Sequence, residues 1–321
     1  MRYRMPHPSP HPSPPPSLHP SPPPALHPHR PASGFTLVEL IVVMVITSII
    51  GLTLMSFMQP TLAAYFATRA RTELAGRADT ALRQMLMDTR RAVPNSLRIP
   101  SDQCFEVVPA VGGGRYRSGP DVRNDTPSGC ASGSSSTCSA WVDTTMATTV
   151  FDVLNVVNTA PKAEDWVVVG NQNGNDVYAG LNRARVSAVS TPQATQGVLR
   201  VRIDSTQFPQ GYTEGRYQVV SSQEPSVFYV CSGADGSTNG QGDGKGTLYR
   251  VTRPFNASYP TACPSVLGAA VVSTQVQSCA FIYDANHGAT QQSGFLWLDM
   301  AITRNGETAH LAVGAHIRNV P

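Results

Sequence analysis

The sequence is poor in charged residues and lacks the short motifs of several common enzyme classes. Only 14% of its 321 residues are charged and 7% are aromatic. It contains no G-x-S-x-G nucleophile motif, no H-E-x-x-H zinc motif and, among its six cysteines, no C-x-x-C pair. The local signatures of hydrolases, zinc enzymes and thioredoxin-like redox proteins are therefore missing. We expect no enzyme activity, no cofactor and no metal site.

A glycine-rich stretch at 235–246 lacks the residues that a calcium or phosphate loop requires. Its twelfth position is Gly246, where a calcium loop needs a bidentate Glu. Gly246 also follows Lys245, where a phosphate loop needs Ser or Thr, and Asn239 replaces the first glycine. We interpret this stretch as a flexible loop between two strands.

Positive charge is not in excess outside the N-terminal segment. The chain has 24 basic and 21 acidic residues, and three of the basic ones, Arg2, Arg4 and Arg30, lie within residues 1–34, which contain no acid. The remainder therefore holds 21 residues of each sign. Proteins that bind nucleic acid generally present a basic surface, so no nucleic-acid partner is expected, although a local basic patch is compatible with this balance.

The N-terminal segment is rich in proline and histidine. Proline at the density of residues 6–33 removes backbone donors and favours extended polyproline II conformations. Five of the eight histidines lie here, but we interpret the segment as a disordered leader instead of a metal site. It also lacks the apolar centre of an ordinary secretory signal peptide.

An apolar segment follows the leader, and Glu39 is its only charge. About 20 apolar residues span a bilayer as a helix, so residues 35–59 are expected to form a transmembrane helix. Arginines precede the segment and none follows before Arg69, which places residue 1 in the cytoplasm and the bulk of the chain in the periplasm. A carboxylate inside a lone membrane helix costs roughly 2.5–3.5 kcal/mol, so Glu39 requires an explanation.

The helical pattern continues beyond the membrane segment. A single helix is predicted over 35–93, kinked but not ended at Pro60, with an amphipathic periplasmic part at 60–96 that Pro94 stops. Seven residues at i, i+3 or i+4 spacing form one apolar stripe: Leu74, Ala78, Ala81, Leu82, Met85, Thr89 and Val93. Two acid–base pairs with i,i+4 spacing lie on the wetter faces: Glu73 with Arg77, and Asp79 with Arg83.

Short β-rich runs alternate with Gly, Asn, Ser and Pro loops over residues 97–321. Several runs alternate polar and apolar residues, and no helix–strand alternation indicates a parallel sheet. We predict an α+β fold in which an antiparallel β-sheet domain packs its apolar face against the helix stripe. The runs expected as strands are 104–111, 148–157, 165–170, 197–203, 216–220, 226–232, 246–253, 279–285, 294–304 and 309–320.

The segment G-F-T-L-V-E-L at 34–40 resembles the cleavage and methylation signature of type IV prepilins and type II secretion pseudopilins. The resemblance implies a pilin-like fold, removal of residues 1–34 by a prepilin peptidase, and methylation of the new terminus at Phe35. Cleavage after Gly34 creates a cationic amine at the end of an apolar helix, and Glu39, about one turn further on, would be its counter-charge during assembly. The alternative is an ordinary signal anchor with a chance glutamate.

Further stretches are similar to minor pseudopilins of mannose-sensitive haemagglutinin (MSHA) pilus systems. They are 87–99, 108–117, 151–154, 178–180, 228–232, 246–250, 277–283 and 316–321. The sequence departs from the family in its long, proline-rich leader and in the late position of Pro60. The resemblance implies an inner-membrane protein that assembles into a pilus or pseudopilus.

The partners that the resemblance implies are a prepilin peptidase, other minor and major pilins, the assembly platform and, through residues 35–59, the membrane. A type II secretion or DNA-uptake pseudopilin is an alternative within the same class. A signal-anchored periplasmic enzyme or ligand-binding protein is an alternative from a different class.

The six cysteines suggest disulfides in an oxidising compartment, and they allow 15 connectivities. Cys130 and Cys138 flank a Ser/Gly-rich loop that a disulfide between them would close. Cys231 and Cys279 lie in family-like stretches at the ends of predicted strands, and we expect them to pair. Cys104 and Cys263 then remain, either paired or free. Alternatively, several of the six are reduced.

Overall fold

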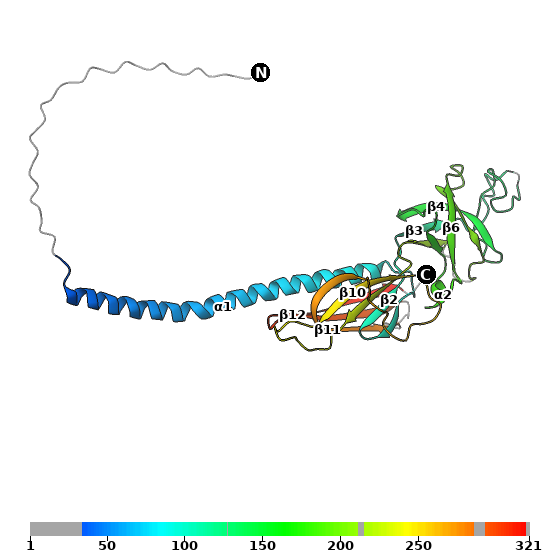
Figure 1. Ribbon diagram of the computed structural model, residues 1–321. Coiled ribbons are helices and arrows are strands. Elements are labelled where there is room, and N and C mark those ends of the chain that lie inside the picture. Colours follow the sequence, from blue (N-terminus) through cyan, green and yellow to red (C-terminus); the bar gives the residue numbers. More distant parts are fainter. Residues whose placement is uncertain (1–33, 127, 211–214, 286–292, 319–321) are drawn as a thin grey trace, which may run out of the picture. The chain divides into compact units, whose positions relative to one another are not determined.

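The computed structural model describes residues 34–126, 128–210, 215–285 and 293–318. The chain divides into two compact units between Pro60 and Thr61, and each is considered separately. A long N-terminal helix and a largely antiparallel β-sheet domain confirm the α+β, pilin-like fold class (Figure 1).

The helix α1 (Leu37–Arg90) contributes to both units, and its backbone stays helical through Pro60. In the first unit, its large apolar side chains are all exposed. By length and composition this helix is able to cross a membrane. Its hydroxyl groups do not interrupt it, because Thr47 and Ser48 donate to the carbonyl oxygens four residues earlier at 2.7 and 2.6 Å.

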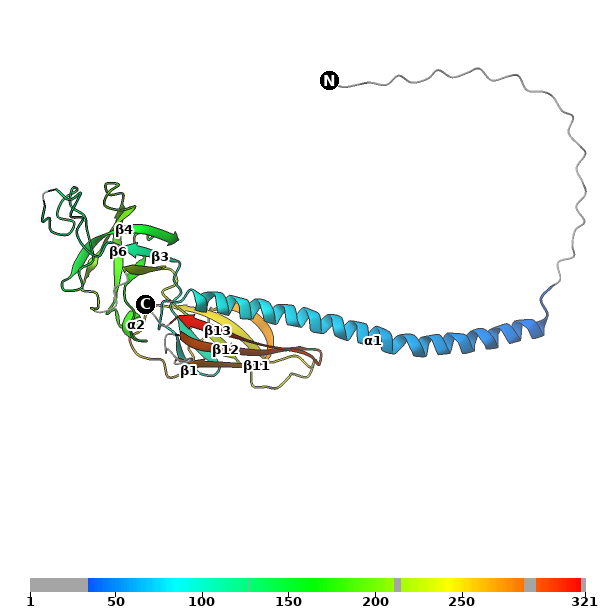
Figure 2. The ribbon, with the colours of Figure 1, turned by 180° about the vertical axis from the view of Figure 1, so that it is seen from behind.

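The part of α1 in the second unit buries the predicted stripe. Leu86 and six of the seven predicted members, all but Val93, are buried in this part of α1, so the predicted packing against the β-domain is confirmed. The helix predicted over 35–93 ends earlier, at Arg90, and Val93 is buried beyond it in a separate apolar cluster. The two i,i+4 ion pairs are also present, with N–O distances of 2.6 Å for Glu73–Arg77 and 2.7 Å for Asp79–Arg83. Figure 2 shows this part of α1 lying along the sheet from the opposite side.

A seven-stranded antiparallel sheet receives this stripe. Its order is β1-β2-β9-β10-β11-β12-β13, so β9 to β13 form a meander. The strands are β1 (Arg98–Ser101), β2 (Cys104–Val107), β9 (Ser226–Ser232), β10 (Gly246–Arg253), β11 (Ala270–Asp284), β12 (Ser293–Arg304) and β13 (Glu307–Arg318). Phe105, Leu248 and Leu298 are fully buried in the core between the sheet and α1.

A closed six-stranded barrel is inserted in the chain between β2 and β9. Its strands pair in the order β3-β4-β7-β6-β5-β8, and β8 closes back onto β3. The elements are β3 (Gly112–Tyr116), β4 (Thr148–Asn158), β5 (Trp166–Val168), β6 (Arg183–Ser190), β7 (Leu199–Thr206) and β8 (Arg216–Val220), with a short helix α2 (Asp176–Ala179) before β6. A separate apolar core, which includes Phe151, Val201 and Tyr217, fills the barrel.

The structure departs from the sequence prediction at several strands. The run expected at 104–111 ends as a strand at Val107, two residues before Pro109. Strand β11 begins at Ala270, nine residues before the predicted run at 279–285. Strands β1, β3 and β6 were not predicted, and the division of the strands between a sheet and a barrel was not recognised.

A buried arginine of β1, Arg98, contacts both the short helix α2 and the loop after β10. The guanidinium of Arg98 stacks on the ring of Tyr178, 3.3 Å from its centroid, and donates to the Asn256 carbonyl oxygen at 3.1 Å. Its N–O distance to Glu106 is 3.5 Å, and both side chains are almost fully buried. Burial raises the pKa of Glu106, while a hydrogen bond from Ser226 and the charge of Arg98 act in the opposite direction.

Candidate processing and assembly site

The start of α1 is fixed by a threonine cap. Residues 34–36 precede the helix, and the backbone N–H of Leu40 donates to the Thr36 carbonyl oxygen at 3.1 Å. The hydroxyl oxygen of Thr36 accepts a hydrogen bond from the backbone N–H of Glu39 at 3.2 Å. Thr36 and Glu39 therefore have the spacing of a capping box, T-x-x-E, which was readable in the sequence but did not enter the prediction.

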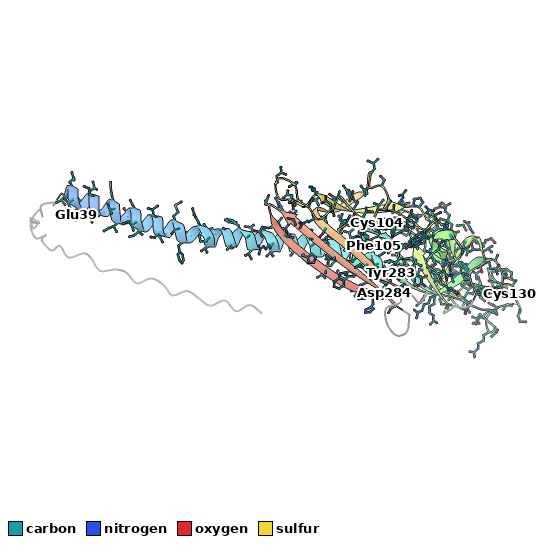
Figure 3. The ribbon with its side chains drawn as sticks, turned by 90° about the horizontal axis from the view of Figure 1, so that it is seen from below. Glu39, Cys104, Phe105, Cys130, Tyr283 and Asp284 are labelled. Carbon is teal, nitrogen blue, oxygen red and sulfur yellow. A yellow bond between two sulfur atoms is a disulfide. The ribbon has the colours of Figure 1, made fainter. Side chains whose placement is uncertain are left out.

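Glu39 lies in the first turn of α1, where a negative charge interacts favourably with the helix dipole. Figure 3 shows this residue close to the start of the helix. Positions 35 and 39 are one helical turn apart, so a helix extended to Phe35 places both on one face. Phe35 is 82% exposed, and no residue within the described part of the chain covers it. The geometry therefore leaves both the expected new terminus and the carboxylate accessible to other molecules.

The helix surface that follows this carboxylate is predominantly apolar. Leu40, Ile41, Val42 and Val43, which follow Glu39, are each about half exposed, and this continues through Met58. Such a surface is stable in lipid, and in a helix assembly it packs against neighbouring helices. A charged group at the edge of this apolar surface is stable only where it contacts a counter-charge or water.

Three disulfides join the six cysteines, and no described cysteine is free. Cys130 bonds to Cys138 and closes the Ser/Gly-rich loop, in which Figure 3 marks Cys130. Cys231 of β9 bonds to Cys279 of β11, across the intervening β10, with a Cα–Cα distance of 6.4 Å.

The third disulfide joins Cys104 of β2 to Cys263 in the loop after β10, 159 residues later. From the sequence, Cys104 and Cys263 are expected to be either paired or free, and the structure pairs them. No local sequence signal links them, because the two segments meet only through the sheet.

The glycine-rich loop at 235–246 uses its polar groups within the fold. The Oδ1 atom of Asn239 accepts hydrogen bonds from the backbone N–H groups of Gln241 and Asp243, at 3.0 and 2.9 Å. Asp243 in turn accepts one from the N–H of Asn305 at 2.8 Å. Within the described ranges, no group of three His, Cys, Asp or Glu side chains is placed to hold a metal ion.

Residues 29–55 match the family model of the prokaryotic N-terminal methylation motif. This match supports a type IV pilin or pseudopilin, a class of protein that is structural and not catalytic. The motif implies processing by a prepilin peptidase and assembly with other pilins, and together with the long apolar helix it fits a membrane-anchored pilin. No curated protein and no solved structure matches the chain.

Proposed function

We propose that this chain is a minor pilin of a type IV pilus, similar to the MSHA pilus biogenesis protein MshO. One observation carries the assignment to the pilin class: the methylation motif at 29–55 contains a capped helix start, with Glu39 in the first turn of a long apolar helix. The MSHA type is supported by the similar stretches between residues 87 and 321.

In this proposal, assembly is the function of the protein. Prepilin peptidase cuts between Gly34 and Phe35, and the amine of Phe35 is methylated. The apolar part of α1 then leaves the lipid and packs among the helices of other subunits, where the amine has lost its contact with bulk water. The carboxylate of Glu39 neutralises an amine, either its own or a neighbour's, and thereby fixes the axial register of the subunit.

The proposed topology is single-pass in the inner membrane, with a cytoplasmic N-terminus and a periplasmic β-domain. Two observations support it. The basic residues near the apolar segment precede it, as the positive-inside rule requires. The three disulfides belong to the globular part, and disulfides persist in oxidising compartments such as the periplasm.

The test is a Glu39→Ala variant with Glu73→Ala as its matched control. Glu73 is an exposed acid on the same helix, paired with Arg77. We expect Glu39→Ala to insert into the membrane normally but to be reduced at least tenfold in sheared filaments, measured by quantitative immunoblot, while Glu73→Ala assembles normally. Normal incorporation of Glu39→Ala would contradict the proposed role. Incorporation into a secretion pseudopilus instead of a pilus would retain the class and reject the MSHA assignment.

A further inference from the structure

The two edges of the seven-stranded sheet differ in how well they are protected against pairing with another strand. Strand β1, at one edge, has four residues and contains Pro100, which has no N–H to donate. Strand β13, at the other edge, has 12 residues and contains no proline. Its register with β12 runs without a bulge from Ser293–Arg318 to Arg304–Glu307. Short strands, prolines and bulges are common means of blocking an edge, and β13 has none of them.

The backbone groups on the outer side of β13 follow from its hairpin with β12. The turn at 305–306 has two residues, both with positive φ (50° and 79°), so Arg304 and Glu307 form the hydrogen-bonded pair that closes it. Hydrogen-bonded and non-bonded pairs then alternate. The Thr303 carbonyl oxygen accordingly turns away from β13 and accepts from the N–H of Gly244 at 2.8 Å. Four residues of β13 therefore direct their N–H and C=O groups away from the sheet, and no described backbone group pairs with them: Thr308, His310, Ala312 and Gly314.

An apolar groove lies beside this open edge, between β13 and the C-terminal part of α1 (Figure 2). It has a volume of about 430 Å³. The buried side chains of Leu82 and Leu86 form one wall, Met87 is 53% exposed, and Leu311 and Val313 of β13 are partly buried beside them. A strand paired with β13 would place every second side chain on the same face as Leu311 and Val313. The groove therefore lies where an added strand would bury its apolar side chains.

The charges along the groove favour an added strand that carries an acid. Asp79 and Arg83 line the groove and already form an ion pair with each other, at 2.7 Å. Arg90 lines the same groove, is exposed and forms no ion pair with a described residue. A carboxylate placed beside Arg90 would gain charge-assisted hydrogen bonds.

A second copy of this chain is a poor source of the added strand. Arg71 bonds to Glu307 at the start of β13, at 2.6 Å, whereas residues 82–90 lie beside 311–313, so α1 and β13 run in the same direction. Antiparallel pairing of two β13 strands would therefore set the two α1 helices in opposite directions. Two chains anchored in one membrane both direct the start of this part of α1 toward it. Pairing with the β1 edge of a second copy is limited by its four residues and by Pro100.

We propose that β13 pairs with an extended segment of a different pilin subunit, which adds an eighth strand to the sheet beside α1. Main-chain hydrogen bonds to Thr308, His310, Ala312 and Gly314 supply the affinity. Alternate apolar side chains in the groove, and an acid beside Arg90, supply the specificity. This inference rests on the proposed function, because it names the kind of subunit contact through which the chain joins the filament.

The first experiment places p-benzoylphenylalanine at position 312 of the full chain and irradiates cells that assemble the filament. We expect a covalent adduct with another pilin, and peptide mapping should place the cross-link in an extended segment of that pilin. An adduct with a second copy of this chain, an adduct with a protein that is not a pilin, or no adduct would overturn the proposal. The matched control has the same group at position 267, which is 95% exposed in the loop after β10. The same adduct in equal amount from position 267 would also contradict the proposal.

Mass spectrometry of the N-terminus of the same samples separates this inference from the proposed function. A chain processed at Phe35 that forms no adduct at position 312 rejects the strand pairing and retains the pilin class. A chain that is not processed there rejects the proposed function, and the strand pairing with it.

The second experiment removes an outward N–H from β13. Ala312→Pro should lower the amount of this protein in sheared filaments at least fivefold, because proline cannot donate a hydrogen bond to the added strand. Ala312→Thr keeps the N–H and should stay within twofold of the unmodified protein. Equal incorporation of the two variants would contradict the pairing.

A variant of the helix side provides the same test if Ala312→Pro fails to fold, as judged by circular dichroism. Met87→Glu puts a charge at the exposed mouth of the groove and should reduce both the adduct at position 312 and incorporation at least fivefold. Its control, Thr72→Glu, adds the same charge at an exposed position of α1 outside the groove and should change neither. An unchanged adduct in Met87→Glu would reject the site.

Discussion

The two parts of α1 have similar helical backbones but opposite surroundings. Before Pro60, the large apolar side chains are exposed, and Leu52 is 72% accessible. After Thr61, the stripe from Leu74 to Thr89 is buried against the sheet, and Met85 has no accessible surface. The first part is thus predominantly apolar and is covered by no described residue of its own unit, while the second is amphipathic and belongs to the fold. One helix is therefore built for two environments.

Acidic residues in the two parts of α1 also differ in their surroundings. In the second part, Asp88 is held by Tyr229 and Arg250 of the sheet. In the first part, Glu39 forms no ion pair with any residue that the structure describes. A carboxylate at the end of an apolar helix, without an ion-pair partner among the described residues, is consistent with the proposed neutralisation by an amine during assembly.

The largest effect expected in the fold separates the two parts of the helix directly. Met85→Ala removes a buried side chain and leaves a cavity, and it should destabilise the globular domain by about 2–5 kcal/mol. Leu52→Ala should leave the unfolding of that domain unchanged, because Leu52 does not contribute to its core. Denaturant titration in detergent, followed by Trp fluorescence, measures both. Equal destabilisation by the two substitutions would show that the division between the helix parts is wrong.

The next effect concerns the sheet core that the second part of α1 covers. Replacing Cys231 and Cys279 by Ser removes the cross-link between β9 and β11 and should cost about 2–4 kcal/mol. The same double replacement at Cys130 and Cys138 should cost less, because that disulfide closes a loop with a sequence separation of only 8, against 48. Thermal unfolding of the two variants gives the comparison, and a greater loss at the short loop would contradict it.

The smallest effect is a pH dependence of the free energy of unfolding. It arises from Glu224, whose partner Arg250 also bonds to Asp88 near the C-terminal end of α1. A hydrogen bond from Arg250 lowers the pKa of Glu224, and Arg250 also holds Asp88 of α1. Because the folded pKa lies below the unfolded value of about 4.3, this stabilisation is present above that pH and is lost as the pH falls through the folded value. Glu224 is partly exposed, so solvent screening keeps the effect below about 1 kcal/mol. Unfolding free energies at pH 7 and pH 3 should differ less in Glu224→Gln than in the unmodified protein, and an unchanged difference would contradict this.

The helix and the last two strands, β12 and β13, were predictable because local periodicity determines them. The stripe repeats every three or four residues, and the prediction of 294–304 differs from β12 by one residue at its start. The burial along β12 alternates over its first half, which is the signal that the sequence carries.

The unpredicted strands each lacked that local signal. Strand β1 contains Pro100, which is tolerated there because β1 lies at an edge of the sheet and pairs only with β2. Strand β3 starts with three glycines, which suggest a loop until the close approach of Thr159 and Asn155 is known. Strand β6 has two arginines and no apolar run, since one of its faces is solvated. The closure of the barrel and the Cys104–Cys263 disulfide depend on contacts between distant segments, which no local pattern encodes.

The candidate processing and assembly site can be proposed from the sequence because its residues are contiguous in the chain. Gly34, Phe35 and Glu39 lie within six residues, and the structure adds the Thr36 cap that fixes the helix start.

The proposed function is tested most directly by mass spectrometry of the N-terminus of the protein purified from cells that contain a prepilin peptidase. The proposal predicts a mature chain that begins with N-methylated Phe35 and lacks residues 1–34. A chain that retains Gly34, or that begins at any other residue, would contradict processing at this site and with it the proposed function.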